Sequence, residues 1–107
     1  MPDLSITREE ASAWLQAYKR AWEQRDSDLI VSLFTPDALY TESRFAAPFV
    51  GHPGIRKYWD TDVVDRQREI AFSFTLWGVK GALAYAHWLT AFTDLKHNAR
   101  RNLDGVF

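Results

Sequence analysis

The sequence predicts a single α+β domain, in which a helical first half is followed by a strand-rich second half. Up to about residue 60, apolar residues recur at spacings of three and four, the period of an amphipathic helix. From Glu69 onward the period changes to two, which is typical of strands. The chain has 107 residues, 47% apolar and 15% aromatic, so it has the size of one domain and the material for a core.

Two helices are expected first. Thr7 and Glu10 form the pattern of a capping box, with Ile6 placed as a hydrophobic staple. The helix that follows has one aromatic-rich stripe, made of Ala11, Trp14, Leu15, Tyr18, Ala21 and Trp22. The polar stretch 25–28 then interrupts the pattern and supplies a new N-cap for a short helix, which Thr35 and Pro36 end.

The remaining elements follow from local signals. Residues 38–42 are expected to form a strand and residues 43–51 a loop, and Gly51-His52-Pro53-Gly54 opens a third helix. A strand from Glu69, a hairpin turn at 78–81, a second strand over 82–93, a polar loop over 94–100 and a third strand over 101–107 complete the chain.

The long strands predict a partner. The second of them places Tyr85, His87 and Leu89 on one face and Ala84, Ala86, Trp88 and Phe92 on the other. Because both faces are largely apolar, we expect helices to cover one and a second copy of the chain to cover the other, which gives a homodimer.

Composition excludes several classes of function. The net charge of −1 offers no basic surface for nucleic acid or an anionic membrane. Without cysteine the chain has no disulfide, thiolate metal site or cysteine nucleophile. The histidines have no metal-ligand spacing, so neither a metal nor a cofactor is expected. The absence of a leader-like start and of long apolar runs predicts a soluble, cytoplasmic protein.

The order of these elements carries a resemblance. The chain resembles the NTF2-like superfamily and, within it, the SnoaL-like proteins. The resemblance lies in the order of a helix, a short helix that begins after Asp26 and ends before Pro36-Asp37-Ala38, a strand, a helix at Gly51-His52 and a meander ending in residues 103–107. The similarity spans residues 7–107. It implies a cone-shaped α+β fold, with three N-terminal helices packed into a strongly curved, mostly antiparallel sheet around an apolar pocket.

The resemblance also implies site residues. Tyr18 matches the oxyanion-binding tyrosine of ketosteroid isomerases, Glu42 stands near the position of their general base, usually Asp, and Asp104 matches their protonated second donor. In such a site a carboxylate removes a proton next to a carbonyl, and neutral donors stabilise the enolate oxygen; this division of roles is the known ketosteroid isomerase case. Each residue also has a structural alternative: Tyr18 could pack in the core, Glu42 could be solvated and Asp104 could cap a turn.

The expected ligand is a small, largely apolar molecule of the steroid or polyketide type, converted by cofactor-independent isomerase or cyclase chemistry. One alternative is a non-catalytic ligand-binding or dimerisation module. Another is a dehydratase-like enzyme that uses His87, which could equally be a satisfied core histidine. The expected pocket residues are Trp22, Phe34, Tyr40, Trp59, Trp77 and Trp88.

Two further features concern the end of the chain. Lys96, His97, Arg100 and Arg101 form a small basic cluster, which could meet an anionic substrate tail at the pocket mouth or could be a solvated loop. The last strand stops at Phe107, whereas family members usually add a final antiparallel strand. We therefore expect one domain over residues 1–107 that lacks this strand or has its open edge covered by a partner chain.

Overall fold

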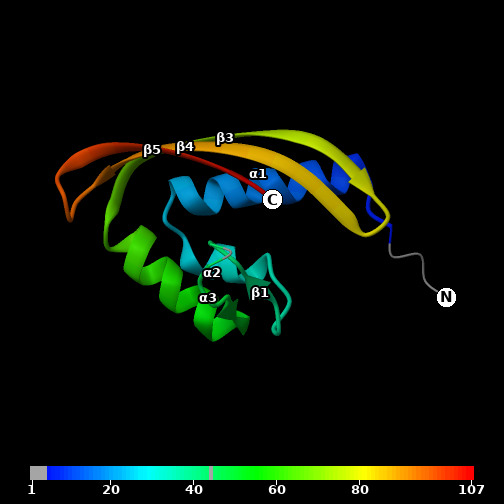
Figure 1. The fold of residues 1–107 in the computed structure, drawn as a ribbon, viewed down its shortest axis with the longest axis horizontal. Coiled ribbons are helices and arrows are strands. Elements are labelled where there is room, and N and C mark those ends of the chain that lie inside the picture. Colours follow the sequence, from blue (N-terminus) through cyan, green and yellow to red (C-terminus); the bar gives the residue numbers. More distant parts are fainter. Residues whose placement is uncertain (1–4, 44) are drawn as a thin grey trace.

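The computed structural model describes residues 5–43 and 45–107 and has the α+β architecture that the sequence predicts. Its helices are α1 (Arg8–Glu23), α2 (Ser27–Ser32) and α3 (Gly51–Trp59), and a π-helix, η1 (Asp60–Val64), continues α3. Its strands are β1 (Leu39–Tyr40), β2 (Phe49–Val50), β3 (Gln67–Lys80), β4 (Leu83–Asp94) and β5 (Ala99–Val106). Figure 1 shows β3, β4 and β5 arching over α1, with α2 and α3 on the other side of that helix.

The starts of α1 and α2 confirm the capping predictions. The Thr7 hydroxyl accepts from the Glu10 backbone N–H at 3.1 Å, and the Glu10 carboxylate accepts from the Thr7 N–H at 3.2 Å. This reciprocal pair satisfies two backbone donors that the first helical turn leaves open. Asp26 caps α2 in the same way, accepting from the Leu29 N–H at 3.0 Å. The Asp26 cap lies at the junction between α1 and α2 and so marks the point where the second helix begins.

The segment between α2 and α3 differs in part from the prediction. The strand expected over 38–42 is reduced to β1, which pairs antiparallel with β2 inside the expected loop. Gly51 begins α3 with φ of +66°, a conformation that favours glycine. Its N–H donates to the Ala38 carbonyl at 2.7 Å. The small β1–β2 ribbon is thereby tied to the start of α3.

The main sheet has the order β3-β4-β5, with antiparallel pairing throughout. The turn predicted at 78–81 is wrong, because β3 continues to Lys80 and the chain reverses at Gly81, where φ is +57°. Gly78 instead follows a register shift after Leu76, the mark of a bulge. The later strands extend a little beyond their predicted ranges, so that β5 begins at Ala99.

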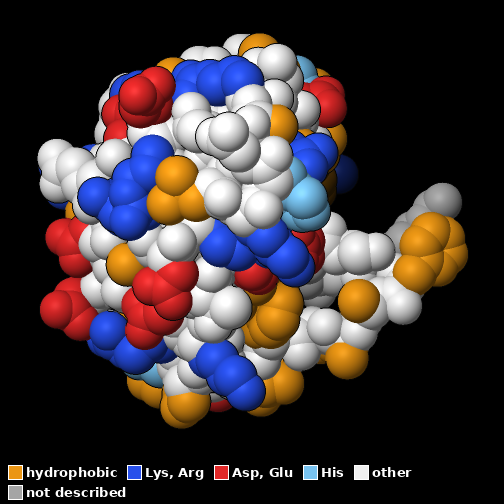
Figure 2. Space-filling view, turned by 90° about the vertical axis from the view of Figure 1, so that its left-hand side faces the viewer, with side chains coloured by type: hydrophobic (Ala, Val, Ile, Leu, Met, Phe, Trp, Pro, Cys, Tyr) orange, Lys and Arg blue, Asp and Glu red, His pale blue; other side chains and the backbone are white. Residues whose placement is uncertain are grey.

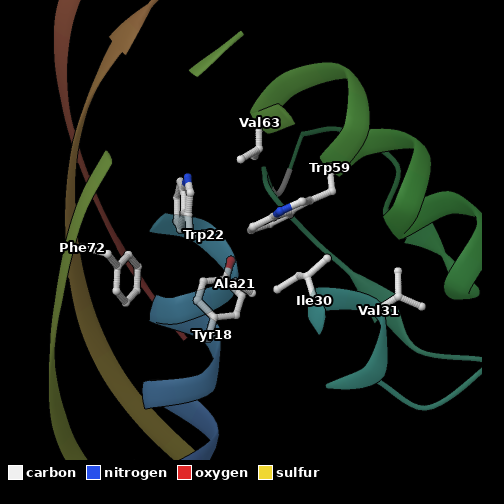
Figure 3. Packing of buried hydrophobic residues seen from close by; sticks show 8 residues of the cluster. All are labelled: Tyr18, Ala21, Trp22, Ile30, Val31, Trp59, Val63 and Phe72. Atoms are coloured by element: carbon white, nitrogen blue, oxygen red, sulfur yellow. The ribbon is translucent and has the colours of Figure 1, made fainter. Parts of the chain in front are cut away.

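The core lies between α1, the smaller helices and one face of the sheet. Figure 3 shows Tyr18, Ala21 and Trp22 of α1 between Phe72 of β3 on one side and Ile30, Val31, Trp59 and Val63 on the other. We call the sheet face that packs against α1 the inner face and the opposite one the outer face. No helix in the described part of the chain is long and apolar enough to cross a membrane.

Candidate functional site

A cavity of about 690 Å³ lies between the inner face of the sheet, α1 and the α3–η1 segment. Its volume is in the range of small-molecule sites. Aromatic side chains from several elements form its apolar wall: Trp14, Trp22, Phe34, Tyr40, Tyr58, Trp88, Phe92 and Phe107. Polar groups gather in two places. We call Tyr40, Tyr58 and Glu42 the tyrosine end, and Arg66, Asp94, His97 and Arg101 the Asp94 end.

The tyrosine end is built on a hydrogen bond between two hydroxyls. Tyr18 Oη lies 2.8 Å from Tyr40 Oη. Tyr18 is fully buried, and within residues 5–43 and 45–107 its hydroxyl has no other hydrogen-bond partner. Its proton therefore belongs on the Tyr40 oxygen, which leaves the Tyr40 O–H free to donate into the cavity. Tyr40 thus forms part of the cavity wall, and Tyr18 lies behind it and donates a hydrogen bond to its oxygen.

These phenols stay protonated at neutral pH. Burial, reinforced by neighbouring Tyr40, raises the pKa of Tyr18 well above its usual value. Burial also raises the pKa of Tyr40, although its hydrogen bond with Tyr18 opposes that shift. Burial, then Tyr40 and the Glu42 carboxylate, raise the pKa of Tyr58. The end therefore presents neutral hydroxyl donors beside a carboxylate.

The structure does not bring Tyr18, Glu42 and Asp104 together. Glu42 is exposed and lines the cavity, whereas Tyr18 lies behind Tyr40. Asp104 pairs with Leu89 across β4 and β5, and directly opposed residues share a face. Asp104 itself borders the cavity, but its carboxylate lies on the outer face beside His87, with its side chain 68% exposed. The expectation that Asp104 donates into the pocket is wrong for this reason.

His87 also lies on the outer face. Its Nε2 is 3.1 Å from Asp104 Oδ2, and its ring stacks on Trp77 with 5.6 Å between ring centroids. Neither His87 nor Trp77 lines the cavity. The dehydratase-like alternative requires His87 inside the pocket, and the strand alternation turns it the other way.

Four of the six predicted pocket aromatics do line the cavity, namely Trp22, Phe34, Tyr40 and Trp88. Trp59 does not, because it is buried in the core against Tyr18 and Trp22. Trp77 does not, because it follows Ser73 and Thr75 at a spacing of two on the outer face of β3, and it is 59% exposed.

Sequence reasoning missed two parts of the site. Tyr58 stacks on Phe49 at 4.3 Å between ring centroids and lies beside Tyr40 at 5.7 Å. Its spacing of three from Ile55 marked it as a core residue of α3, with no local sign that it faced a cavity. Asp94 was assigned to a polar loop, but it ends β4 on the inner face and is only 3% exposed.

Asp94 organises the basic residues around it. Its carboxylate accepts from His97 Nδ1 at 2.9 Å, Arg101 Nε at 3.1 Å and the Lys96 backbone N–H at 3.0 Å. Arg66 Nη2 lies 3.4 Å from both carboxylate oxygens. The hydrogen bond from His97, with those from Arg101 and Lys96, holds the pKa of Asp94 well below its usual range, against the opposing effect of burial. Asp94 is therefore ionised at neutral pH.

Comparisons with solved structures support the fold. A conserved protein from Planctomyces limnophilus shares 20% identity at a TM-score of 0.72, over 90% of this chain and 75% of that one. A ketosteroid isomerase-like protein from Erwinia carotovora atroseptica shares 15% identity at 0.68, over 92% and 79%. A putative calcium/calmodulin dependent protein kinase II association domain from Xanthomonas campestris shares 12% at 0.66, over 92% and 71%.

At these identities the likeness shows the fold alone, which is the NTF2-like fold expected from the order of elements. No curated protein matches the chain. The sequence itself gives the closer assignment, because residues 15–107 match the SnoaL-like domain and include every residue of the cavity wall described above except Trp14. The chain belongs to the SnoaL-like domain family.

Proposed function

We propose that the protein binds a small, largely apolar, ring-containing molecule in the cavity, with the ligand's oxygen at the tyrosine end. The observation that carries this proposal is the combination of an aromatic wall with two hydroxyl donors, Tyr40 and Tyr58. Flat apolar surfaces gain from burial against such a wall, and a few polar groups fix the orientation of the ligand.

The same end has the groups for a proton transfer. In a ligand with a carbonyl, the Glu42 carboxylate would take a proton from the adjacent carbon. The electron pair of the broken C–H bond would move to the carbonyl oxygen, and the Tyr40 and Tyr58 hydroxyls would donate to the resulting enolate. Tyr58 thus takes the part that the sequence assigned to Asp104.

A ligand screen tests the binding proposal. Steroids, aromatic polyketides and terpenoids are added to the protein, and thermal shift identifies binders because binding stabilises the folded state. The affinity of a binder with an oxygen substituent is then measured for Tyr40→Phe and for Tyr85→Phe, an exposed tyrosine of β4. Tyr40→Phe should weaken binding about 2- to 10-fold, as expected for one neutral hydrogen bond. No binder in any class, or equal effects of the two variants, contradicts the proposal.

Glu42→Gln separates an enzyme from a non-catalytic binding module. With a substrate in hand, this variant should lower turnover about 10²- to 10⁴-fold and leave ligand affinity nearly unchanged, because a general base acts mainly in the transition state. Glu9→Gln, an exposed carboxylate in the first turn of α1, is the control. A ligand that binds and is never converted favours the module.

We also infer a homodimer through the outer face of the sheet. This face carries Trp77, Leu89 and Val106 with 59%, 51% and 62% of their surfaces exposed. Large contiguous apolar patches are uncommon on monomers. A second copy would bring the same surface, which suits a two-fold symmetric contact.

A further inference from the structure

We propose that the Asp94 end binds the carboxylate of the ligand, so that the preferred ligands are ring acids with an apolar body. This inference rests on the proposed function, since it names the chemical class of the molecule bound in the same cavity. Its basis is a set of donors that converge on the inner face beside Trp22, Trp88 and Phe92.

Arg101 is the central group. It pairs with Phe92 across β4 and β5, which places its side chain on the inner face of the sheet. The Nε of Arg101 donates to Asp94, whereas its two terminal nitrogens make no hydrogen bond within the described part of the chain. The side chain is 44% exposed and borders the cavity. A guanidinium in this state can offer two parallel N–H groups to a carboxylate.

Gln67 supplies a second, independent donor. Its side-chain oxygen accepts from Trp22 Nε1 at 2.7 Å, so the amide nitrogen is the end that remains. Gln67 is 8% exposed and lines the cavity, and its amide nitrogen makes no hydrogen bond within residues 5–43 and 45–107. An amide N–H open to the cavity can donate to an acceptor on a ligand.

Charge in the cavity orients the acid. At the Asp94 end, Arg66 and Arg101 face Asp94, and Asp62, which also lines the cavity, lies 3.6 Å from Arg66, so Arg101 is the cation that a ligand can reach. His97 donates through Nδ1 to the same carboxylate, at 2.9 Å. Figure 2, viewed from the side of the β4–β5 turn, shows Lys and Arg side chains interspersed with Asp and Glu over this end of the molecule. Glu42 at the tyrosine end repels an anion, which directs the carboxylate toward Arg101.

Asp94 also prepares the site before a ligand arrives. Because it fixes Arg101 Nε and His97 Nδ1, little side-chain freedom is left to lose on binding. The arrangement favours a planar carboxylate over a neutral oxygen at this end.

The test compares ring acids with their neutral primary amides. The pairs are 2-naphthoate and 2-naphthamide, anthracene-2-carboxylate and its amide, and pyrene-1-carboxylate and its amide, titrated at pH 7.5 by tryptophan fluorescence. At least one acid should bind about 10- to 100-fold more tightly than its amide, the range of hydrogen bonds to charged groups. Arg101→Gln should abolish that difference by weakening the acids far more than the amides.

Arg100→Gln is the matched control. Arg100 is the adjacent arginine of β5 but pairs with Thr93 on the outer face, where it donates to the Glu69 carbonyl at 2.7 Å. It should change neither affinity. Amides that bind as tightly as their acids overturn the carboxylate site and leave the proposed function standing. Equal losses in the two arginine variants also overturn the site. If neither acids nor amides bind, the carboxylate site is rejected, and the proposed function is decided by the ligand screen.

Discussion

The hydrogen bond between Tyr18 and Tyr40 should respond unequally to removal of its two hydroxyls. Tyr18 is fully buried and depends on Tyr40, whereas Tyr40 lines the cavity, where water can replace its partner. Tyr18→Phe should therefore cost only the net value of one hydrogen bond, about 0.5–1.5 kcal/mol. Tyr40→Phe leaves the Tyr18 hydroxyl buried without an acceptor, which costs about 1–3 kcal/mol.

Urea unfolding followed by tryptophan fluorescence measures both values, because five tryptophans report on the fold. The double variant removes both hydroxyls, so it should cost clearly less than the sum of the single losses. Tyr85→Phe on the outer face should lie within about 0.5 kcal/mol of the wild type. If Tyr18→Phe is as costly as Tyr40→Phe, or if the single losses add, the assignment of Tyr18 as the dependent partner is refuted.

Three further predictions concern stability and assembly. Since the folded-state pKa of Asp94 is depressed, it stabilises the fold above its unfolded pKa of about 3.9 and loses this effect as pH falls toward the lower folded value. Asp94→Asn should thus lower the urea midpoint at pH 7 and flatten its decline below pH 4; an unchanged decline would contradict this. Gly51→Ala should lower the stability of the fold more than Gly81→Ala. Both variants strain a residue with positive φ, at a cost of about 1–3 kcal/mol, but only at Gly51 would the new Cβ meet a backbone atom, the Pro36 oxygen at 2.8 Å. Equal urea midpoints of the two variants would refute this contact. Light scattering at micromolar concentration should give twice the 12.4 kDa chain mass, and Leu89→Lys should give the monomer; a wild-type mass of about 12 kDa rejects the dimer.

Local signals in the sequence were enough to predict the helices. Thr7 with Glu10, and Asp26 before α2, are caps whose hydrogen bonds span three residues. Such contacts depend on the neighbouring chain alone. The period of two likewise predicted the inner and outer residues of β4, because alternation is a property of a single strand.

The candidate site was harder to predict, because it depends on register between strands. A shift of one residue moves a side chain to the other face of a sheet. Asp104 opposes Leu89 only because the turn after Asp94 is four residues long, shorter than the loop expected over 94–100. Without that register, a match of residue type could not tell the pocket side of β5 from the outer side.

Trp77 was misplaced although the alternation of β3 locates it. It lies two residues after Thr75, which pairs with His87, so it falls on the outer face, where it stacks on His87. Trp59 was misplaced for another reason. It lies on the apolar stripe of α3, and only the packing of three elements decides whether such a residue fills the core or borders a cavity.

The alternation of side chains along β4 and β5 also separates the two proposed roles of the sheet, ligand binding on the inner face and dimer formation on the outer face. Asp94 and Arg101 lie on the inner face, whereas Leu89 and Arg100 lie on the outer one. A substitution on the outer face should therefore change association without altering the affinity for a ring acid, provided that dimer formation does not reshape the cavity. Because sites without shared partners contribute nearly additively, coupling between Leu89→Lys and Arg101→Gln in ligand affinity would reveal that the two faces act together.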